Sequence, residues 1–220
     1  MFLAAKYRAI KSEIEPCKLI AVSKTKPIED ILQAYEAGCR DFGENKVQEM
    51  LAKQEQLPKD IRWHLIGHLQ SNKVKYIASF VHLIHSVDSL KLLQEINKQA
   101  QKSNRTIDCL MQIHIAQEES KFGLDFDEAE AILQNPQVSL LKNIKIVGLM
   151  GMASFTDKQE QIGAEFAGLK HFFEYCKEKY QTENIAFTEL SMGMSGDYAL
   201  AIKEGATMVR IGSTLFGARV

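Results

Sequence analysis

Cysteine is scarce in this sequence, and its few positions are far apart. The four cysteines are Cys17, Cys39, Cys109 and Cys176, and none of them forms a Cys-x-x-Cys pair. Such wide spacing does not suggest a disulfide framework. We therefore expect reduced thiols in a protein of a reducing compartment.

The sequence also lacks an excess of charge and a long apolar run. Its 27 basic and 28 acidic residues leave a net charge of −1, which gives no electrostatic attraction to nucleic acid or to an anionic membrane. No stretch approaches the roughly 20 apolar residues that span a bilayer. Residues 1–10, which include Lys6 and Arg8, have no apolar core of the kind that a signal peptide needs. We expect a cytoplasmic protein that binds neither nucleic acid nor membranes.

No low-complexity segment or Gly/Ser-rich linker divides the chain, and its 220 residues fit a single domain, 1–220. Short apolar runs rich in β-branched residues alternate with longer amphipathic runs. The runs predicted to be strands are Leu19–Ser23, Asp41–Gly43, Trp63–Ile66, Leu83–Val87, Ile107–Ile115, Ile146–Met150, Phe187–Leu190 and Met208–Ile211. The runs predicted to be helices are Ile28–Ala37, Val47–Glu55, Lys73–Ile77, Leu90–Gln101, Asp127–Leu133, Gln159–Tyr180 and Tyr198–Glu204.

This alternation predicts an α/β fold with a parallel sheet. The strand runs are apolar in both phases, as in strands that are covered on both faces. Each connection is long enough to hold a helix, as parallel neighbours require. Eight strand runs in a chain of this length favour a closed (β/α)8 TIM barrel, with an open doubly wound sheet as the alternative. The second run, Asp41–Gly43, is the weakest of the eight.

Polar residues gather where the predicted strands end. In a barrel the functional site lies at the carboxyl ends of the strands and in the loops that follow them. The polar and glycine-containing exits are Ser23–Thr25, Gly43–Asn45, His64 with Gly67–Asn72, Ser86 with Asp88, His114, Met150–Met152, Ser191–Gly196 and Arg210–Ser213. This clustering at one rim predicts a site there.

Lys24 ends the first predicted strand, in phase with Ile20 and Val22. A lysine at the end of a buried strand is unfavourable unless it is neutralised or bonded. Desolvation favours the neutral amine, which is the nucleophile that a Schiff base requires. The alternative is that the side chain reaches past the barrel mouth into solvent.

The loops after strands seven and eight predict a phosphate site. Barrels often bind phosphate there through backbone N–H groups and a helix N-terminus. A helix is expected to begin near Ser195, and Gly212 and Ser213 are small enough for their amides to approach phosphate oxygens. A helix cap and a tight turn are the alternative roles for Ser195 and Gly212.

Arg210 lies near the end of the last predicted strand, where a guanidinium needs a partner. It could bind a phosphate or lie against a pyridine nitrogen. The alternative is an ion pair with Glu44 or Glu189.

Several segments resemble the pyridoxal phosphate (PLP) homeostasis proteins, in the family's order and over nearly the whole chain. They are Ala21–Pro27, Phe42–Asn45, His64–Lys73, Ser120–Gly123, Gly148–Met150, Ser191–Ser195, Met208–Ser213 and Phe216–Arg219. The family consists of single barrels similar to the N-terminal domain of alanine racemase, a fold type III arrangement. The resemblance implies a PLP-binding protein of vitamin B6 homeostasis without substantial catalysis.

Carried over by position, the resemblance makes Lys24 the lysine of the internal aldimine, with Lys26 outside that bond. Asn45 would lie beside the cofactor ring and Arg210 would face the pyridine nitrogen. The residues expected around the phosphate are Ser191, Ser195, Gly212 and Ser213. Two positions depart from the family's pattern: His68 stands where proline is expected, and His114 where asparagine is expected. The segment before Lys18 also looks short for a first helix.

These residues favour storage or delivery of PLP over catalysis. A permanent positive charge against the pyridine nitrogen disfavours its protonation, which weakens the ring as an electron sink. The alternatives are a PLP-dependent amino-acid racemase and a Schiff-base lyase. A racemase needs a second base from a C-terminal domain, and the sequence ends at Val220, directly after the last strand exit. We expect PLP, and PLP-dependent apo-enzymes, as partners of a monomer or weak dimer, and no bound metal.

Overall fold

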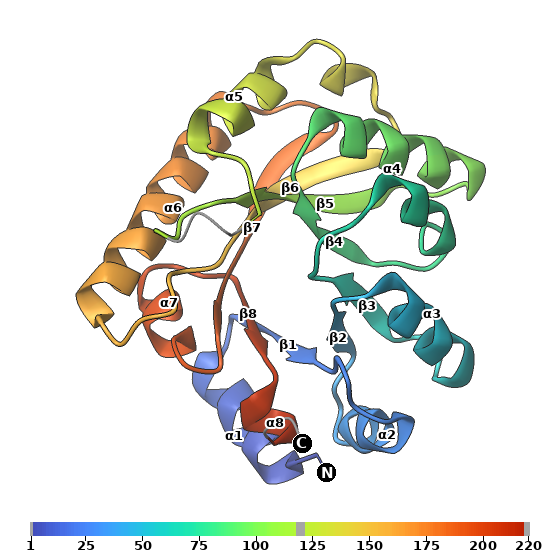
Figure 1. The fold of residues 1–220 in the computed structure, drawn as a ribbon, viewed down its shortest axis with the longest axis vertical. Helices are drawn as coiled ribbons and strands as arrows, with labels where there is room; N and C mark the ends of the chain where they lie inside the picture. Colours follow the sequence, from blue (N-terminus) through green and yellow to red (C-terminus); the bar gives the residue numbers. More distant parts are fainter. Residues whose placement is uncertain (1, 118–121, 218–220) are drawn as a thin grey trace.

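The computed structural model describes residues 2–117 and 122–217. Its helices and strands follow one another as a repeated βα pattern (Figure 1). The strands are β1 Lys18–Val22, β2 Asp41–Glu44, β3 Arg62–Leu65, β4 Leu83–Val87, β5 Ile107–Ile113, β6 Ile144–Gly151, β7 Ile185–Met194 and β8 Met208–Ile211. The helices are α1 Ala4–Ile14, α2 Ile28–Glu36, α3 Val47–Gln56, α4 Leu90–Lys102, α5 Phe126–Gln134, α6 Gln159–Lys179, α7 Tyr198–Lys203 and α8 Ser213–Phe216, with 3₁₀ helices η1 Ser71–Tyr76 and η2 Val138–Leu140.

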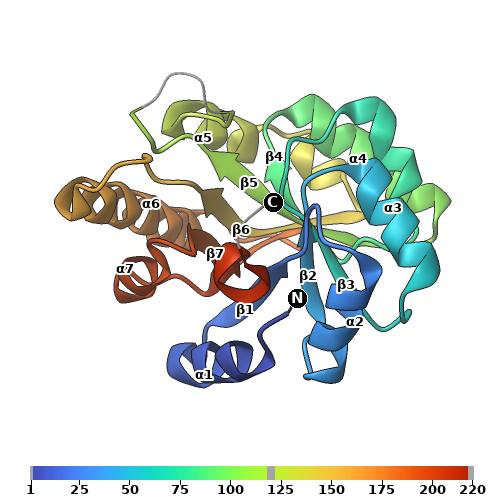
Figure 2. The ribbon, with the colours of Figure 1, turned by 60° about the horizontal axis from the view of Figure 1, so that its bottom comes forward.

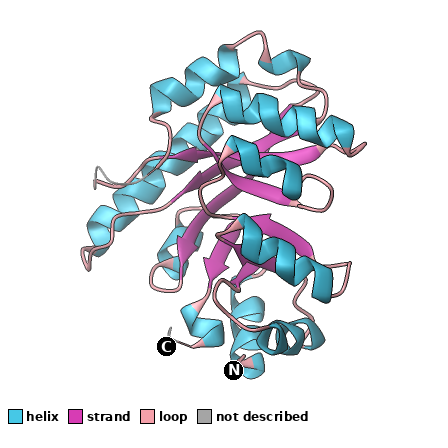
Figure 3. Ribbon diagram, turned by 45° about the vertical axis from the view of Figure 1, so that its right-hand side comes forward, coloured by secondary structure: helices cyan, strands magenta, loops and turns pink. Residues whose placement is uncertain are grey.

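The eight strands form one closed parallel barrel in chain order. The ends of the sheet meet where β1 pairs with β8, with Ile20 opposite Arg210. The helices surround the strands on the outside (Figure 3). The predicted (β/α)8 barrel is confirmed, including its weakest strand, β2, and the open-sheet alternative is wrong.

The apolar core has two layers because the barrel wall has an inner and an outer face. A small inner cluster fills the barrel and consists of Ile20, Leu83, Leu110, Met150 and Met208. A larger cluster lies mainly between the strands and the helices, and includes the fully buried Trp63, Phe166 and Phe187. None of the helices in the described part of the chain has the length and apolarity needed to cross a bilayer.

The segment before Lys18, which looked short, forms a complete helix. Helix α1 lies beside α8, so the first and last described segments are neighbours (Figure 2). The backbone N–H of Leu3 donates to the carbonyl oxygen of Leu215 at 2.9 Å, and the rings of Phe2 and Phe216 are 5.2 Å apart. These contacts connect the start of the described chain to α8, the helix that follows the last strand.

Two elements differ from the sequence prediction. The expected helix Lys73–Ile77 is instead a 3₁₀ helix, η1, in which only Val74 is buried, so it has no apolar stripe to support a longer α-helix. Strand β7 extends beyond the expected Phe187–Leu190 because its later residues keep pairing with β8 across a register shift between Ser191 and Met194. This extension places Ser191 inside the sheet rather than in a loop.

Gly148 in β6 has φ +155° and lies against the backbone of β7, where an added Cβ would be 1.7 Å from the carbonyl oxygen of Glu189. Gly148→Ala should therefore lower the free energy of unfolding by at least about 2 kcal/mol, through strain and overlap. The matched control is Gly168→Ala on the exposed side of α6, where an added Cβ meets nothing within 4 Å. It should raise stability by up to about 1 kcal/mol. Urea denaturation measures the free energy of unfolding of both variants. Equal effects would contradict the close contact between Gly148 and the backbone of β7.

Candidate functional site

A cavity of about 630 Å³ opens at the carboxyl ends of the strands. It brings together six of the seven predicted site residues: Lys24, Asn45, Ser195, Arg210, Gly212 and Ser213. The seventh, Ser191, is fully buried and is not among the described residues that line the cavity. Lys26 also lines the cavity, and its amine donates to the carbonyl oxygens of Phe216 and Gly217 at 3.0 and 3.3 Å.

Lys24 occupies a tight turn directly after β1. The N–H of Lys26 donates to the carbonyl oxygen of Ser23 at 3.0 Å, and Thr25 adopts φ +64° to close the turn. The N–H of Thr25 in turn donates to Glu49 Oε1 at 2.5 Å. The backbone on both sides of Lys24 is therefore fixed, while its half-buried side chain lines the cavity.

A buried ion-pair cluster supports this turn from below. Lys53, on α3, donates to Glu44 Oε1 at 2.8 Å, to Glu49 Oε1 at 2.7 Å and to the carbonyl oxygen of Ser23 at 2.8 Å. The Ser23 hydroxyl donates to the same Glu44 oxygen at 2.6 Å. Burial raises the pKa of Glu44, and Lys53 opposes this shift by stabilising the carboxylate. The cluster links α3, β2 and the Lys24 turn.

Asn45 is presented to the cavity by close packing between two loops. Gly67, after β3, lies so close to Asn45 that an added Cβ would be 2.4 Å from the Asn45 carbonyl oxygen. His68 also lines the cavity, where its ring stacks on Phe122 with 4.7 Å between ring centres, and it lies 3.2 Å from Asp88. His114, the other departure from the family's pattern, is not among the described lining residues.

The loops after β7 and β8 meet on the wall expected to bind phosphate. The Ser195 hydroxyl accepts a hydrogen bond from the Gly212 N–H at 3.2 Å, which joins the two loops. Helix α7 begins at Tyr198, as the predicted helix Tyr198–Glu204 does, so it starts later than the loop pattern near Ser195 indicated and Asp197 is its N-cap. Ser195 therefore bridges two loops, and α8 begins at Ser213 directly after β8.

Arg210 is buried at the base of the cavity, with 4% of its surface exposed. Its Nη1 donates to the carbonyl oxygen and the hydroxyl of Ser191 at 2.8 and 2.7 Å, and its Nη2 donates to the Gly151 carbonyl oxygen at 2.9 Å. Burial lowers the pKa of Arg210 to about 10, partly opposed by Asp197, so the group is still a cation at neutral pH.

The alternative ion pairs considered for Arg210 do not form. Glu44 bonds to Lys53, and Glu189 bonds to Lys18. Within the described part of the chain no carboxylate lies within ion-pair distance of Arg210. Its positive charge is therefore held by neutral oxygens and is available to a ligand in the cavity.

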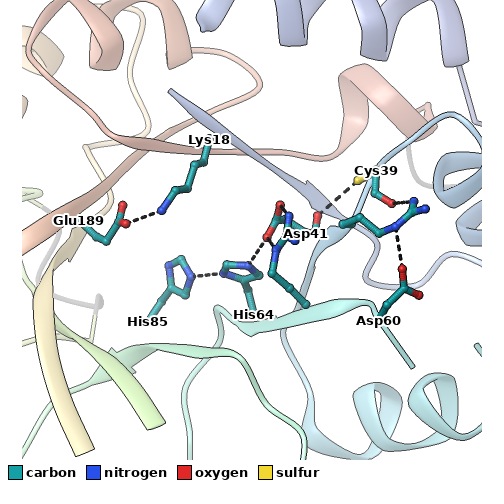
Figure 4. Close-up of polar contacts among 9 residues, drawn as sticks. Lys18, Cys39, Asp41, Asp60, His64, His85 and Glu189 are labelled. Carbon is teal, nitrogen blue, oxygen red and sulfur yellow. Dashed lines mark hydrogen bonds and ion pairs between the residues drawn. The ribbon is translucent and has the colours of Figure 1, made fainter. Parts of the chain in front are cut away.

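Beneath Arg210, a chain of hydrogen bonds crosses the barrel interior, and Figure 4 shows its part from His85 through His64 to Asp41. His85 Nδ1 lies 3.0 Å from the Ser191 hydroxyl, His85 Nε2 lies 2.9 Å from His64 Nδ1, and His64 Nε2 lies 3.1 Å from Asp41 Oδ1. Asp41 also binds Arg62 at the amino end of the barrel. The strand pattern alone did not indicate this chain. The available signal was polar side chains in the inward phase of buried strands, such as His85 two residues after Leu83.

Among the described residues, no group of three or more His, Cys, Asp or Glu side chains is placed to hold a metal ion. Residues Ser120, Lys121, Ala218 and Arg219 of the motifs used above lie outside the described residues.

A model of the family described as "Alanine racemase, N-terminal domain" matches residues 2–220. A pyridoxal phosphate homeostasis protein of Synechocystis sp. is 42% identical over 100% of both chains, and one of Aquifex aeolicus is 41% identical over 92% of this chain and 87% of its own. This chain belongs to the pyridoxal phosphate homeostasis protein family.

Solved structures agree with this assignment. PipY of Synechococcus elongatus without PLP matches with a TM-score of 0.91 at 39% identity, over 97% of this chain and 99% of that chain. The same protein with PLP bound matches with a TM-score of 0.88. Alanine racemase of Bartonella henselae shares the fold, with a TM-score of 0.74 at 20% identity. The match covers 98% of this chain and 58% of the racemase chain.

Lys53→Ala should destabilise the protein by about 3–5 kcal/mol, because it leaves the buried Glu44 carboxylate without its cation. The control is Lys142→Ala, which removes the exposed pair with Glu183 and should leave the melting temperature nearly unchanged. Thermal denaturation at neutral pH compares the two variants. A Lys53→Ala protein as stable as the control would show that the cluster does not support the turn.

Proposed function

We propose that this protein binds pyridoxal 5′-phosphate in the cavity at the carboxyl end of the barrel, with Lys24 as the covalent anchor. The observation that carries the proposal is that an amine, Lys24, and a buried guanidinium, Arg210, line the same cavity. The Lys24 amine would condense with the cofactor aldehyde to form an imine and release one water. Binding of PLP by the related PipY supports this assignment.

The remaining lining residues fit the rest of the cofactor. The joined loops at Ser195 and Gly212, with Ser213, would hold the phosphate through small side chains and backbone N–H groups. Asn45 would lie beside the ring. Ser191, which hydrogen-bonds Arg210 from behind, would reach the cofactor only through that residue. A volume of about 630 Å³ is ample for a molecule of this size.

Bound PLP supplies an electron sink for reactions at amino-acid carbons. We propose that Arg210 faces the pyridine nitrogen, and a guanidinium that stays charged disfavours protonation there. The ring would then be a weak electron sink, which suits a protein that holds PLP for vitamin B6 homeostasis rather than one that turns over substrate. The names of the related proteins support this function.

We also propose a cellular compartment, partners and an oligomeric state for this protein. The four cysteines are free thiols, which supports a reducing compartment such as the cytoplasm. PLP-dependent apo-enzymes would be the recipients of the cofactor, and the protein would act as a monomer or weak dimer, with residues 1–220 as one domain.

Purified protein mixed with PLP should develop a visible absorption band that borohydride removes, and peptide mass spectrometry should place the reduced adduct on Lys24. Lys24→Ala should abolish the trapped adduct. Lys26→Ala is the matched control, because it removes an amine from the same cavity that already bonds to backbone carbonyls. An adduct found on Lys26 instead would overturn the assignment.

The proposal also predicts that alanine racemisation by the PLP-loaded protein is no faster than with free PLP. The physical reason is the weak electron sink, together with the lack of a tyrosine among the described residues that line the cavity. Circular dichroism of the alanine in solution measures the rate. A saturable rate well above that of free PLP would favour the racemase alternative.

A further inference from the structure

The hydrogen-bonded chain from Asp41 to Arg210 has a fixed direction. Asp41 accepts hydrogen bonds from Arg62, and although burial alone would raise its pKa, the hydrogen bonds from Arg62 and His64 hold the pKa well below its usual range. An ionised carboxylate can only accept, so His64 must carry its proton on Nε2. Each later bond in the chain follows from this constraint.

We expect both imidazoles to be neutral at neutral pH. Burial lowers the pKa of His64, opposed by Asp41, and burial lowers the pKa of His85 well below its ordinary value. A neutral His64 that donates from Nε2 accepts at Nδ1, and His85 must therefore donate to it from its own Nε2. His85 then accepts at Nδ1 from the Ser191 hydroxyl.

The Ser191 oxygen is left with its lone pairs directed at Arg210, 2.7 Å from Nη1. Every donor in the chain points from Arg210 toward Asp41, so the guanidinium and the carboxylate at the two ends polarise the bonds between them. Figure 4 shows the imidazole of His64 between His85 and Asp41, with both hydrogen bonds drawn. The chain thus fixes the side of Ser191 that faces Arg210, and it ends on the Asp41–Arg62 ion pair rather than on a carboxylate in the cavity.

We propose that His64, His85 and Ser191 are positioning residues that act through Arg210, holding its guanidinium in the orientation that keeps the ring nitrogen of bound PLP unprotonated. This inference rests on the proposed function. It differs from the expectation that Ser191 contacts the phosphate, because Ser191 here bonds to Arg210 and His85.

Other charged or titratable groups also act on this chain from the surrounding elements. Those that influence its imidazoles or Arg210 are Lys18, Asp41, Arg62, His82 and Asp197. All of them are unchanged in the variants below, so their contributions are common to every protein compared.

The first test uses the protein without ligand. Nitrogen-15 NMR of the histidine rings at neutral pH should find His64 and His85 both neutral and both protonated on Nε2, with the signals assigned from His64→Gln and His85→Gln. A proton on Nδ1 of either ring, or a charged imidazole, would be incompatible with this direction of the hydrogen bonds and would overturn the proposal.

The second test compares Ser191→Ala with Ser86→Ala, each loaded with PLP labelled at the ring nitrogen. Ser86 is the matched control: its hydroxyl is equally buried, it follows His85 in β4, and it has no hydrogen-bond partner within the described residues. Loss of one charge-assisted bond to Arg210 should raise the pH at which the ring nitrogen protonates by about one unit relative to wild type and to Ser86→Ala. Nitrogen-15 NMR across a pH series measures the pH at which the ring nitrogen protonates.

His85→Leu provides a second variant, because Ser191 keeps its hydroxyl but loses the imidazole that accepts from it. It should shift ring protonation in the same direction as Ser191→Ala. If wild-type protein forms no adduct with PLP, the proposed function fails. If wild type binds PLP but Ser191→Ala and His85→Leu titrate like Ser86→Ala, the positioning role alone fails.

Discussion

The interior of this barrel holds a buried, charged guanidinium, that of Arg210. The hydrogen bonds of the barrel interior and the polar wall of the cavity meet at this side chain. Burial lowers the pKa of Arg210, yet not enough to neutralise it at physiological pH. A buried cation is unfavourable unless its donors are satisfied. Here two backbone carbonyl oxygens and the Ser191 hydroxyl accept three of its hydrogen bonds, with no carboxylate from the described residues in contact. A carboxylate in that place would cancel the charge that the cavity offers a ligand.

Buried charges are stabilised differently on the two sides of the cavity. On the Lys24 side, opposite charges are in direct contact, in the cluster of Lys53 with Glu44 and Glu49. On the Arg210 side, neutral oxygens accept from the cation, and a hydroxyl and two imidazoles connect it to the Asp41–Arg62 ion pair. Buried ion pairs add little net stability but are damaging to break. We infer that both arrangements fix geometry, the first for a turn and the second for a side chain.

The sequence predicted the architecture well, because parallel strands buried on both faces leave a clear apolar pattern. All eight strands were located, and six of the seven site residues line one cavity, since strand exits in a barrel converge at one rim. Ser191 was misplaced as a loop residue because the length of β7 depends on a register shift with β8 that no local pattern encodes. The ion-pair partners of Glu44 and Glu189 could not be predicted either, because they depend on the tilt and stagger with which the barrel closes.

The hydrogen-bonded chain from Asp41 to Arg210 depends on closure of the barrel rather than on any single strand. Asp41, His64, His85, Ser191 and Arg210 come from five strands, β2, β3, β4, β7 and β8. In an open sheet β2 and β8 would be far apart, whereas in a closed barrel their inward side chains face a common interior. A neutral imidazole has one donor and one acceptor nitrogen, so a proton on His64 Nε2, donated to Asp41, determines every bond as far as Arg210.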